Sequence, residues 1–237
     1  MIELYYCKLP ESRESTGIDK LLFHVSKERQ LRIKRFVKID DAYRSLIGDL
    51  LVRFALKERY GSIDRELKIE TNDYGKPFLS EYPSIHYNIS HSGEYVVCAV
   101  HDDAVGVDIE YMGPYDLPLA KGFFSEEEYQ DLLNAKDDGI ATFYDIWTLK
   151  ESYVKAVGEG LSKPLKDFSM KKHTDGFVQI TDIHTDRQIT DYICKQYMVD
   201  SGYLLSVCAH HAKDDQFRSE PTCVIFQELC ESLNCHS

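Results

Sequence analysis

Two acidic residues in the segment VGVDIE have the type and spacing of metal ligands. The segment is typical of a β-strand, in which alternate side chains point to the same side, so Asp108 and Glu110 share one face. Carboxylates placed side by side repel unless a cation lies between them, and Mg²⁺ binds one or two carboxylates together with water and substrate phosphates. The alternative is a solvent-facing strand with two incidental acids, which is common in half-exposed strands.

A second segment, WTLKESYVKAVGEG, adds a third carboxylate and a lysine. Glu151 and Lys155 are four residues apart, so they are neighbours on one face of a helix, just outside its apolar stripe. Glu151 could complete a metal site and Lys155 could bind a phosphate, although an ordinary salt bridge uses the same spacing. Lys150 falls inside the apolar stripe, so its amine either extends to solvent or meets a buried acid. Trp147, one turn before Glu151, is expected in the core rather than at a ligand.

Helices and strands must bring these segments together. Apolar residues at helical spacing predict two long helices, 40–60, which ends at Gly61, and 141–157, which ends near Gly158. A Ser-x-x-Glu capping box predicts that a further helix begins at Ser125. Strands are predicted in short alternating segments after residue 165 and, before that, at 85–90, 94–101 and 104–110.

The chain contains a weak internal repeat. The segment SGEYVVCAVH at 92–101 is echoed by SGYLLSVCAHH at 201–211. Two duplicated halves would leave a cleft between them, which is a common position for a ligand. We therefore expect an α+β pseudo-dimer with halves of residues 1–103 and 104–237, each with a small antiparallel sheet packed on a long helix.

Composition narrows the class of protein. The 237 residues are 43% hydrophobic and 29% charged, the mix of a folded protein, and no apolar run approaches the roughly 20 residues of a membrane span. The N-terminus lacks the pattern of a secretory signal, and the seven cysteines are an odd number with no C-x-x-C pair. We therefore expect a cytoplasmic protein without disulfides. The formal charge of −12 argues against nucleic-acid binding.

Positive charge is nevertheless concentrated in one segment. Ten basic and only five acidic residues lie between residues 27 and 59. Such a patch suits a phosphorylated small molecule or an acidic partner, and the alternative is a pair of helix faces exposed to solvent.

These segments together resemble a known family. VGVDIE at 105–110 and WTLKESYVKAVGEGLS at 147–162 resemble the two signature motifs of the 4′-phosphopantetheinyl transferases. The resemblance covers nearly the whole chain, because it extends to RIKRFVKIDDAYRSLIGDLLVR (32–53), YGKP (74–77), HYNISHSG (86–93) and FFSEEEY (123–129). Length and the N-terminal half are similar to the surfactin-synthetase-activating type, which is a single chain with two pseudo-symmetric halves, and this implies a monomer.

The resemblance implies a reaction. Members of the family transfer the phosphopantetheine arm of coenzyme A to a serine hydroxyl of an apo acyl or peptidyl carrier protein and release adenosine 3′,5′-bisphosphate. By this resemblance Asp108, Glu110 and Glu151 would hold Mg²⁺, and Glu151, directly or through water, would take the serine proton. Lys155 matches the lysine that contacts the pyrophosphate, and His91 matches the histidine that contacts the nucleotide phosphates, with Ser90 beside it.

The resemblance also assigns the coenzyme A contacts. The 3′-phosphate would lie against the basic segment, at Arg44 and at Arg29 and Arg32, where the relatives carry lysine at the last two positions. The loop around the adenine and nearby phosphates would be formed by Tyr74, Gly75, Lys76 and Pro77. The carrier protein would dock after Gly158 and near 112–124, where apolar residues are either exposed or in the core: Leu117, Phe123 and Phe124.

Two other functions use the same residues. A Mg²⁺-dependent pyrophosphatase of coenzyme A or nucleotides would need the three carboxylates and Lys155 but would deliver water to the phosphorus. A non-catalytic coenzyme A-binding protein would need the basic patch alone. For the transferase we expect an acidic carrier protein as partner, with no contact to nucleic acid or membrane.

Overall fold

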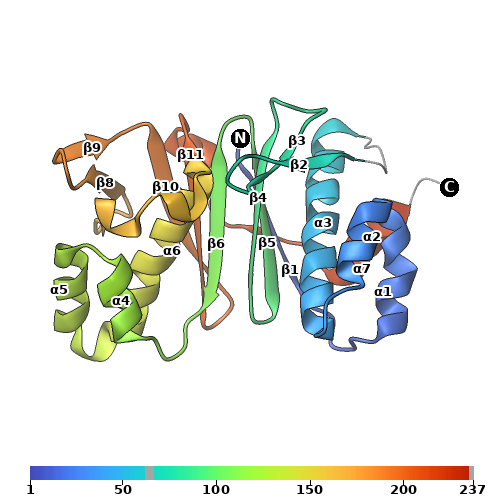
Figure 1. Ribbon diagram of the computed structural model, residues 1–237, viewed down its shortest axis with the longest axis horizontal. Coiled ribbons are helices and arrows are strands. Elements are labelled where there is room, and N and C mark those ends of the chain that lie inside the picture. The colour runs from blue at the N-terminus through green and yellow to red at the C-terminus, as the bar shows by residue number, and fades with distance from the viewer. Residues whose placement is uncertain (62–66, 235–237) are drawn as a thin grey trace.

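Two antiparallel sheets lie side by side at the centre of the molecule, between two long helices (Figure 1). The computed structural model describes residues 1–61 and 67–234. The first sheet is covered by the helix α3 (Ile39–Tyr60) and contains, in spatial order, β12 (Thr222–Cys223), β1 (Glu3–Lys8), β5 (Tyr95–His101) and β4 (His86–Ser92). Within it β12 pairs parallel with β1, and the other neighbours are antiparallel.

The second sheet repeats this plan with fewer strands. It is covered by the helix α6 (Gly139–Val157) and contains, in spatial order, β10 (Tyr192–Val199), β11 (Tyr203–His210) and β6 (Val105–Tyr111). All neighbours are antiparallel. The predicted α+β class, with a small antiparallel sheet and a long helix in each half, is confirmed.

The two sheets share one apolar core. Leu4 of β1 and Val97 of β5 belong to the same buried cluster as Val107 of β6 and Leu205 of β11. Burial of apolar side chains from both sheets in one cluster stabilises their association as it stabilises each sheet, because the free energy follows the apolar area removed from water.

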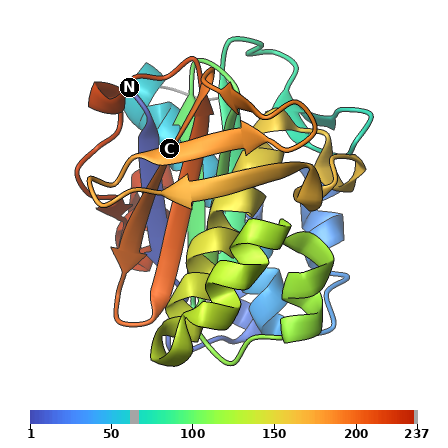
Figure 2. The ribbon, with the colours of Figure 1, turned by 90° about the vertical axis from the view of Figure 1, so that its left-hand side faces the viewer.

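Smaller elements surround this centre. On the side of α3 lie α1 (Ser15–Leu21), α2 (Lys27–Ile33), the hairpin β2 (Ile69–Thr71) and β3 (Pro77–Leu79), and α7 (Phe226–Asn234). On the side of α6 lie α4 (Leu117–Phe123), α5 (Glu126–Asn134) and a sheet of β7 (Phe168–Lys172), β8 (Val178–Asp182) and β9 (Arg187–Ile189). Figure 2 shows this small sheet, in gold and orange, above the yellow-green α4 and α5.

A glycine allows α6 to approach β6 closely. A Cβ at Gly106 would lie 2.1 Å from the carbonyl oxygen of Ser152 and 2.3 Å from the amide nitrogen of Ala156. No side chain fits there, because the nearest atoms belong to the helix backbone. Gly106 therefore sets the distance between the strand that carries Asp108 and the helix that carries Glu151.

The predicted helix boundaries hold within one or two residues. The first long helix ends at Gly61, whose φ of +81° lies in the region that glycine adopts without strain. The second ends at Gly158, with φ of +83°. The capping box at Ser125 is confirmed: its hydroxyl accepts from the Glu128 amide, and the Glu128 carboxylate accepts from the Ser125 amide at 2.7 Å.

Lys150 meets a buried acid, one of the two outcomes expected from its position in the apolar stripe. Its amine lies 2.8 Å from a carboxylate oxygen of Glu128, and both side chains are buried. The amine also donates to the carbonyl oxygens of Leu165 and Phe168, at 2.8 and 2.6 Å. This ion pair fastens α6 to α5 and to the start of β7.

The described cysteines carry no disulfide, as expected: Cys7, Cys98, Cys194, Cys208, Cys223 and Cys230 are free thiols. Within residues 1–61 and 67–234, no helix has the length and apolar character needed to cross a bilayer.

Candidate active site

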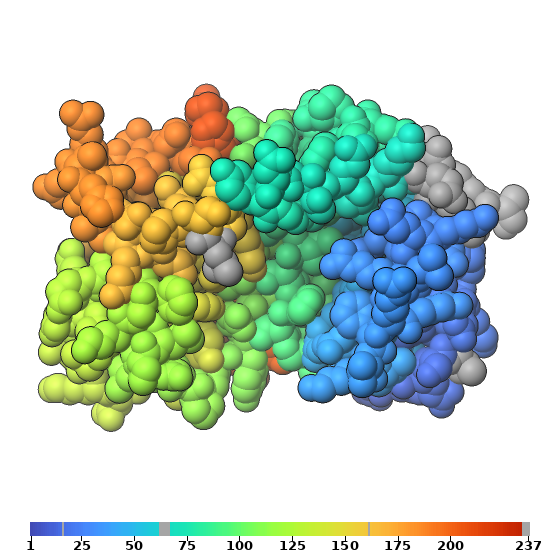
Figure 3. All heavy atoms as spheres, viewed as in Figure 1, coloured from blue at the N-terminus to red at the C-terminus, as the bar shows by residue number. Residues whose placement is uncertain are grey.

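A pocket of about 340 Å³ opens where the two sheets meet α6. It is lined by Ile89, Ser90 and His91 of β4, Asp108 and Glu110 of β6, and Trp147, Glu151 and Lys155 of α6. Five of these residues were predicted as metal ligands or catalytic groups from the sequence, and the fold brings them together from β4, β6 and α6. Figure 3 shows the face on which the teal loop around residue 75 lies against the yellow end of α6.

Asp108 is buried at the centre of the site. One carboxylate oxygen, Oδ1, accepts from the Lys155 amine at 2.6 Å and from the Ser90 hydroxyl at 3.0 Å. The other oxygen, Oδ2, is buried and has no hydrogen-bond partner among the described residues. Burying a carboxylate oxygen without a hydrogen-bond partner costs free energy. A bound cation or a hydrogen-bond donor of a ligand could pair with this oxygen.

The three carboxylates all have pKa values above the ordinary range. Burial raises the pKa of Asp108 despite the Lys155 amine beside it. Burial raises the pKa of Glu110, and repulsion by Asp108 adds to this effect. Burial also raises the pKa of Glu151, against the attraction of Lys155. One lysine thus leaves three desolvated carboxylates insufficiently neutralised, and a hard divalent cation with oxygen ligands fits this donor set.

Serine side chains of β4 hold the acids of β6. The Ser92 hydroxyl donates to Glu110 at 2.8 Å and accepts from the Tyr111 amide at 3.1 Å. The Asn88 side chain accepts from the Val107 amide at 2.9 Å. With Ser90, these residues occupy alternate positions of β4, so they face β6 together. The roles of Asn88 and Ser92 were not predicted from the sequence. The alternating polar residues N-x-S-x-S within HYNISHSG could have indicated them.

Lys155 and His91 lie at different depths of the pocket. The Lys155 amine bridges Asp108 and the Ser90 hydroxyl, which it reaches at 3.2 Å. His91 lies at the exposed mouth of the pocket, where partial desolvation and the charge of Arg44 lower its pKa. His91 is therefore neutral at physiological pH and can accept or donate a hydrogen bond to a phosphate.

Trp147 has two roles, of which the sequence analysis predicted one. Its ring stacks on Phe143 at 5.9 Å between centroids and meets Phe123 edge-on at 5.9 Å, as expected of a core residue. It also lines the pocket, on the side of α6 that carries Glu151.

The three arginines predicted to contact coenzyme A are not equally placed. Arg44 donates to the carbonyl oxygen of Gly93 at 3.0 Å and pairs with Asp41 at 2.6 Å, which brings its charge to the mouth of the pocket beside His91. Arg29 pairs with Asp49 at 3.2 Å, and Arg32 is exposed on α2. Neither Arg29 nor Arg32 lines the pocket.

A second pocket, of about 270 Å³, adjoins the first through Glu151 and Lys155. Its lining includes all four residues of the predicted loop: Tyr74, Gly75, Lys76 and Pro77. Gly75 has φ of +86°, which glycine adopts without strain. Asn72 fixes the loop, because its side chain accepts from the Tyr74 and Lys76 amides and donates to the Gly158 carbonyl at 3.0 Å.

The amine of Lys76 is occupied by the protein itself. It donates to the carbonyl oxygens of Val105 and Ala156, at 3.1 and 3.0 Å. Burial lowers its pKa to about 8. In this structure Lys76 thus joins the loop to β6 and α6.

Comparison with known proteins agrees with this geometry. The family model for the 4′-phosphopantetheinyl transferase superfamily matches residues 104–208, and the model for the N-terminal part of 4′-phosphopantetheinyl transferases matches residues 13–103. With a full-length relative at 40% identity, the chain belongs to the 4′-phosphopantetheinyl transferase family.

Among its relatives is the 4′-phosphopantetheinyl transferase Sfp of Bacillus subtilis, 40% identical over 94% of this chain and 97% of that protein. The 4′-phosphopantetheinyl transferase gsp of Aneurinibacillus migulanus is 40% identical over 73% of each chain. The human L-aminoadipate-semialdehyde dehydrogenase-phosphopantetheinyl transferase is 31% identical over 60% of this chain and 51% of that protein. The chain is thus similar over 94% of its length to the Sfp type, as its motifs indicated.

Proposed function

We propose that this chain transfers the 4′-phosphopantetheine arm of coenzyme A to a serine of an apo peptidyl or acyl carrier protein, with the pocket between β4, β6 and α6 as its active site. The serine oxygen forms a bond to the phosphorus that bears the pantetheine arm, the bridging bond of the pyrophosphate breaks, and adenosine 3′,5′-bisphosphate leaves. The observation that carries the proposal is the buried, unpartnered Oδ2 of Asp108 beside two further carboxylates with raised pKa values.

Asp108, Glu110 and Glu151 would hold Mg²⁺, which neutralises charge on the pyrophosphate oxygens when it is bound. Lys155 supplies a compact positive charge at the same place, already within 2.6 Å of Asp108. Glu151, directly or through a water molecule, would accept the serine proton. Because phosphoryl transfer depends chiefly on positioning and charge neutralisation, these roles account for the main requirements of the reaction.

The adjoining pocket is proposed to take the adenosine part of coenzyme A. Its loop residues Tyr74 to Pro77 present an aromatic ring and backbone groups, and Tyr74 is exposed enough to stack on a base. Arg44, at the mouth beside His91, is the arginine best placed for the 3′-phosphate. Arg29 and Arg32 would reach the nucleotide only at its outer edge.

The carrier protein is proposed to dock on α4. Leu117 and Leu119 are 40% and 38% exposed, whereas Phe124 is buried and belongs to the core. An enzyme with a charge of −12 needs such a local apolar contact to bind an acidic carrier. Leu119→Glu should raise the KM for the carrier and leave the KM for coenzyme A unchanged; equal changes in both would contradict the docking surface.

Intact mass spectrometry of an apo carrier domain tests the reaction. After incubation with the protein, coenzyme A and Mg²⁺, the carrier should gain the mass of one phosphopantetheine arm, and a chelator should prevent the gain. Asp108→Asn and Glu151→Gln should each lower turnover by about 100-fold or more, because each removes charge from the metal site with little change of volume. Asp137→Asn, an exposed acid just before α6 and outside both pockets, is the matched control.

The same experiment separates the alternatives. Release of free phosphopantetheine without a carrier would indicate a pyrophosphatase. Binding of coenzyme A without gain of mass on several peptidyl and acyl carriers would indicate a non-catalytic binding protein. Near-normal turnover of both Asp108→Asn and Glu151→Gln would refute the metal site.

A further inference from the structure

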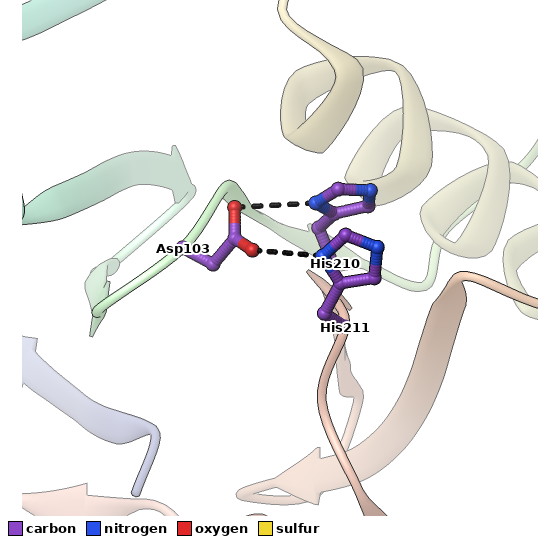
Figure 4. Close-up of side chains that lie close together, drawn as sticks. All are labelled: Asp103, His210 and His211. Atoms are coloured by element: carbon purple, nitrogen blue, oxygen red, sulfur yellow. Dashed lines mark hydrogen bonds and ion pairs between the residues drawn. The ribbon is translucent and has the colours of Figure 1, made fainter.

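A second group of metal-ligating side chains lies outside the candidate active site, where the two halves of the chain join. Asp103 lies in the turn between β5 and β6, His210 is the last residue of β11, and His211 follows it. Figure 4 shows the two imidazole rings facing the carboxylate. Nδ1 of His210 lies 3.2 Å from Oδ1 of Asp103, and Nδ1 of His211 lies 3.2 Å from Oδ2. The ring centroids are 3.6 Å apart.

The backbone holds both histidines in this position. The amide of His210 donates to the carbonyl oxygen of Ala104 at 2.9 Å, and the amide of His211 donates to that of Asp191 at 2.7 Å. His211 has φ of +48°, in the left-handed region, which costs a side-chain-bearing residue on the order of 1 kcal/mol. These backbone hydrogen bonds therefore fix the chain at both histidines and keep the two imidazole rings close together.

Asp191 completes the surroundings of His210. Its carboxylate oxygen lies 3.5 Å from Nε2, the ring nitrogen that faces away from Asp103. An imidazole that gives its Nε2 proton to a carboxylate keeps a lone pair on Nδ1, and this is the arrangement found around histidines that bind zinc. The site thus contains two donors from imidazole, one from a carboxylate, and a supporting carboxylate.

Asp103 is ready to act as an anionic ligand. Its carboxylate is held in place by the Ala104 amide, which donates to Oδ1 at 2.6 Å. Asp103 and Asp191 together bring two negative charges to a site whose two imidazoles are uncharged when they serve as metal ligands.

We propose that Asp103, His210 and His211 bind one divalent transition-metal ion of the Zn²⁺ class, which fastens the turn between the two halves to the end of β11. The ligand atoms lie within 4.8 Å of one another. Two ligands at about 2.1 Å from a tetrahedral zinc ion are roughly 3.4 Å apart, close to the 3.2 Å between each Nδ1 and its carboxylate oxygen. A fourth position remains for water.

The donor set distinguishes this site from the carboxylate pocket. Imidazole suits Zn²⁺, Cu²⁺ and Ni²⁺, whereas Mg²⁺ prefers oxygen ligands. Asp103 also lies in the turn before β6, whereas Asp108 lies within that strand and lines the carboxylate pocket. The two sites therefore differ in both chemistry and position.

Zn²⁺ titration of the full chain by calorimetry, with saturating Mg²⁺, tests the proposal. The variant His211→Asn removes an exposed ligand, and asparagine tolerates the left-handed backbone. It should bind one equivalent of Zn²⁺ at least tenfold more weakly than the unaltered protein. The matched control is His173→Asn, another exposed histidine, in the turn after β7, which should titrate as the unaltered protein does. Asp191→Asn should weaken binding by about 10-fold, because it removes the supporting carboxylate.

Thermal unfolding gives a second readout that does not depend on activity. Zn²⁺ should raise the Tm of the unaltered protein and of His173→Asn, but not that of His211→Asn, because a ligand stabilises only the state that binds it. Three results would each overturn the proposal: no Zn²⁺ bound by the unaltered protein, the same Zn²⁺ binding in His211→Asn, or a Zn²⁺ equivalent lost in Asp108→Asn and kept in His211→Asn. The last result would place the ion in the carboxylate pocket.

Discussion

Glu110 shows how single residues in this site are held in an unfavourable state. Its carboxylate is half-buried, has one hydroxyl donor in Ser92, and lies near the charge of Asp108. Its raised pKa means that the folded protein binds a proton there more tightly than the unfolded chain does. The charged carboxylate therefore lowers the free energy of unfolding of the metal-free protein, and the same charge allows the site to bind a cation.

The Glu110→Gln variant should make this visible. Without metal, the variant should be more stable than the unaltered protein at pH 7 to 8, where the carboxylate is charged. The difference should shrink as pH falls through the raised pKa of Glu110, and vanish below the ordinary carboxyl pKa of about 4, where both states carry the proton. Urea unfolding of both proteins across this pH range measures it.

Mg²⁺ binding should also become stronger as pH rises. Since the metal requires deprotonated carboxylates, its apparent affinity for the unaltered protein should rise from pH 6 to pH 8. A stability advantage of Glu110→Gln that is constant across pH, or that grows in acid, would show that charge at this position is not the cause.

The helix α6 is the element that connects the site to the rest of the fold. Glu151 and Lys155 face the pocket, while Lys150, the residue before Glu151, is buried on another side of the same helix. Its ion pair with Glu128 and the close approach at Gly106 fix the helix from two directions. Each contact leads to a separate prediction.

Lys150→Met should lower the free energy of unfolding by about 3 to 5 kcal/mol, because it leaves the buried Glu128 carboxylate without its counterion. Adding Glu128→Gln should recover part of this loss, since the amide oxygen can still accept from the Ser125 or Met170 backbone. Denaturant unfolding measures both. The neighbouring exposed pair Lys171–Glu127 is the control, and Lys171→Met should cost less than about 1 kcal/mol. Equal losses from Lys150→Met and Lys171→Met would contradict the ion-pair argument.

Gly106→Ala should lower stability by at least about 3 kcal/mol and reduce carrier modification, because its Cβ would overlap the backbone of α6 and push Glu151 away from Asp108. Gly48→Ala on α3 is the comparison: its Cβ would lie 3.1 Å from a methyl of Ile89, a side chain that can shift. Gly48→Ala should therefore be milder in both assays, and the reverse order would refute this account of the helix packing.

The sequence predicted elements better than contacts between them. Local spacing was enough to predict the two long helices, the capping box at Ser125 and the shared face of the β6 carboxylates. The repeat of apolar residues and the hydrogen bonds of a helix cap depend only on residues near one another in the chain. The partner of Lys150 could be predicted only as an acid, since Glu128 lies on another helix and tertiary packing decides the pair. That Arg29 and Arg32 do not line the pocket was likewise invisible, because charge alone does not say which way a helix faces.

At the scale of the whole molecule, the two halves depend on each other. The apolar cluster that contains Leu4 and Val97 also contains Val107 and Leu205, and the side chains of β4 hold the acids of β6. Separate chains of residues 1–103 and 104–237 should therefore each lack a cooperative unfolding transition, because each exposes half of a shared core.

Mixing the two fragments should restore the transition and some carrier modification. Circular dichroism during thermal unfolding, together with the mass assay, measures this recovery. A single sharp transition in either fragment alone would mean that the halves are independent domains.

The return of β12 to the edge of β1 has a consequence for synthesis on the ribosome. The strand β1 is synthesised well before the strand that pairs with its outer edge, Thr222–Cys223, and before the helix Phe226–Asn234 that packs against α3. An unpaired strand edge invites pairing with other chains. The outer edge of β1 therefore stays unpaired until Thr222–Cys223 has been synthesised, and this is the interval in which a chaperone would matter to the nascent chain.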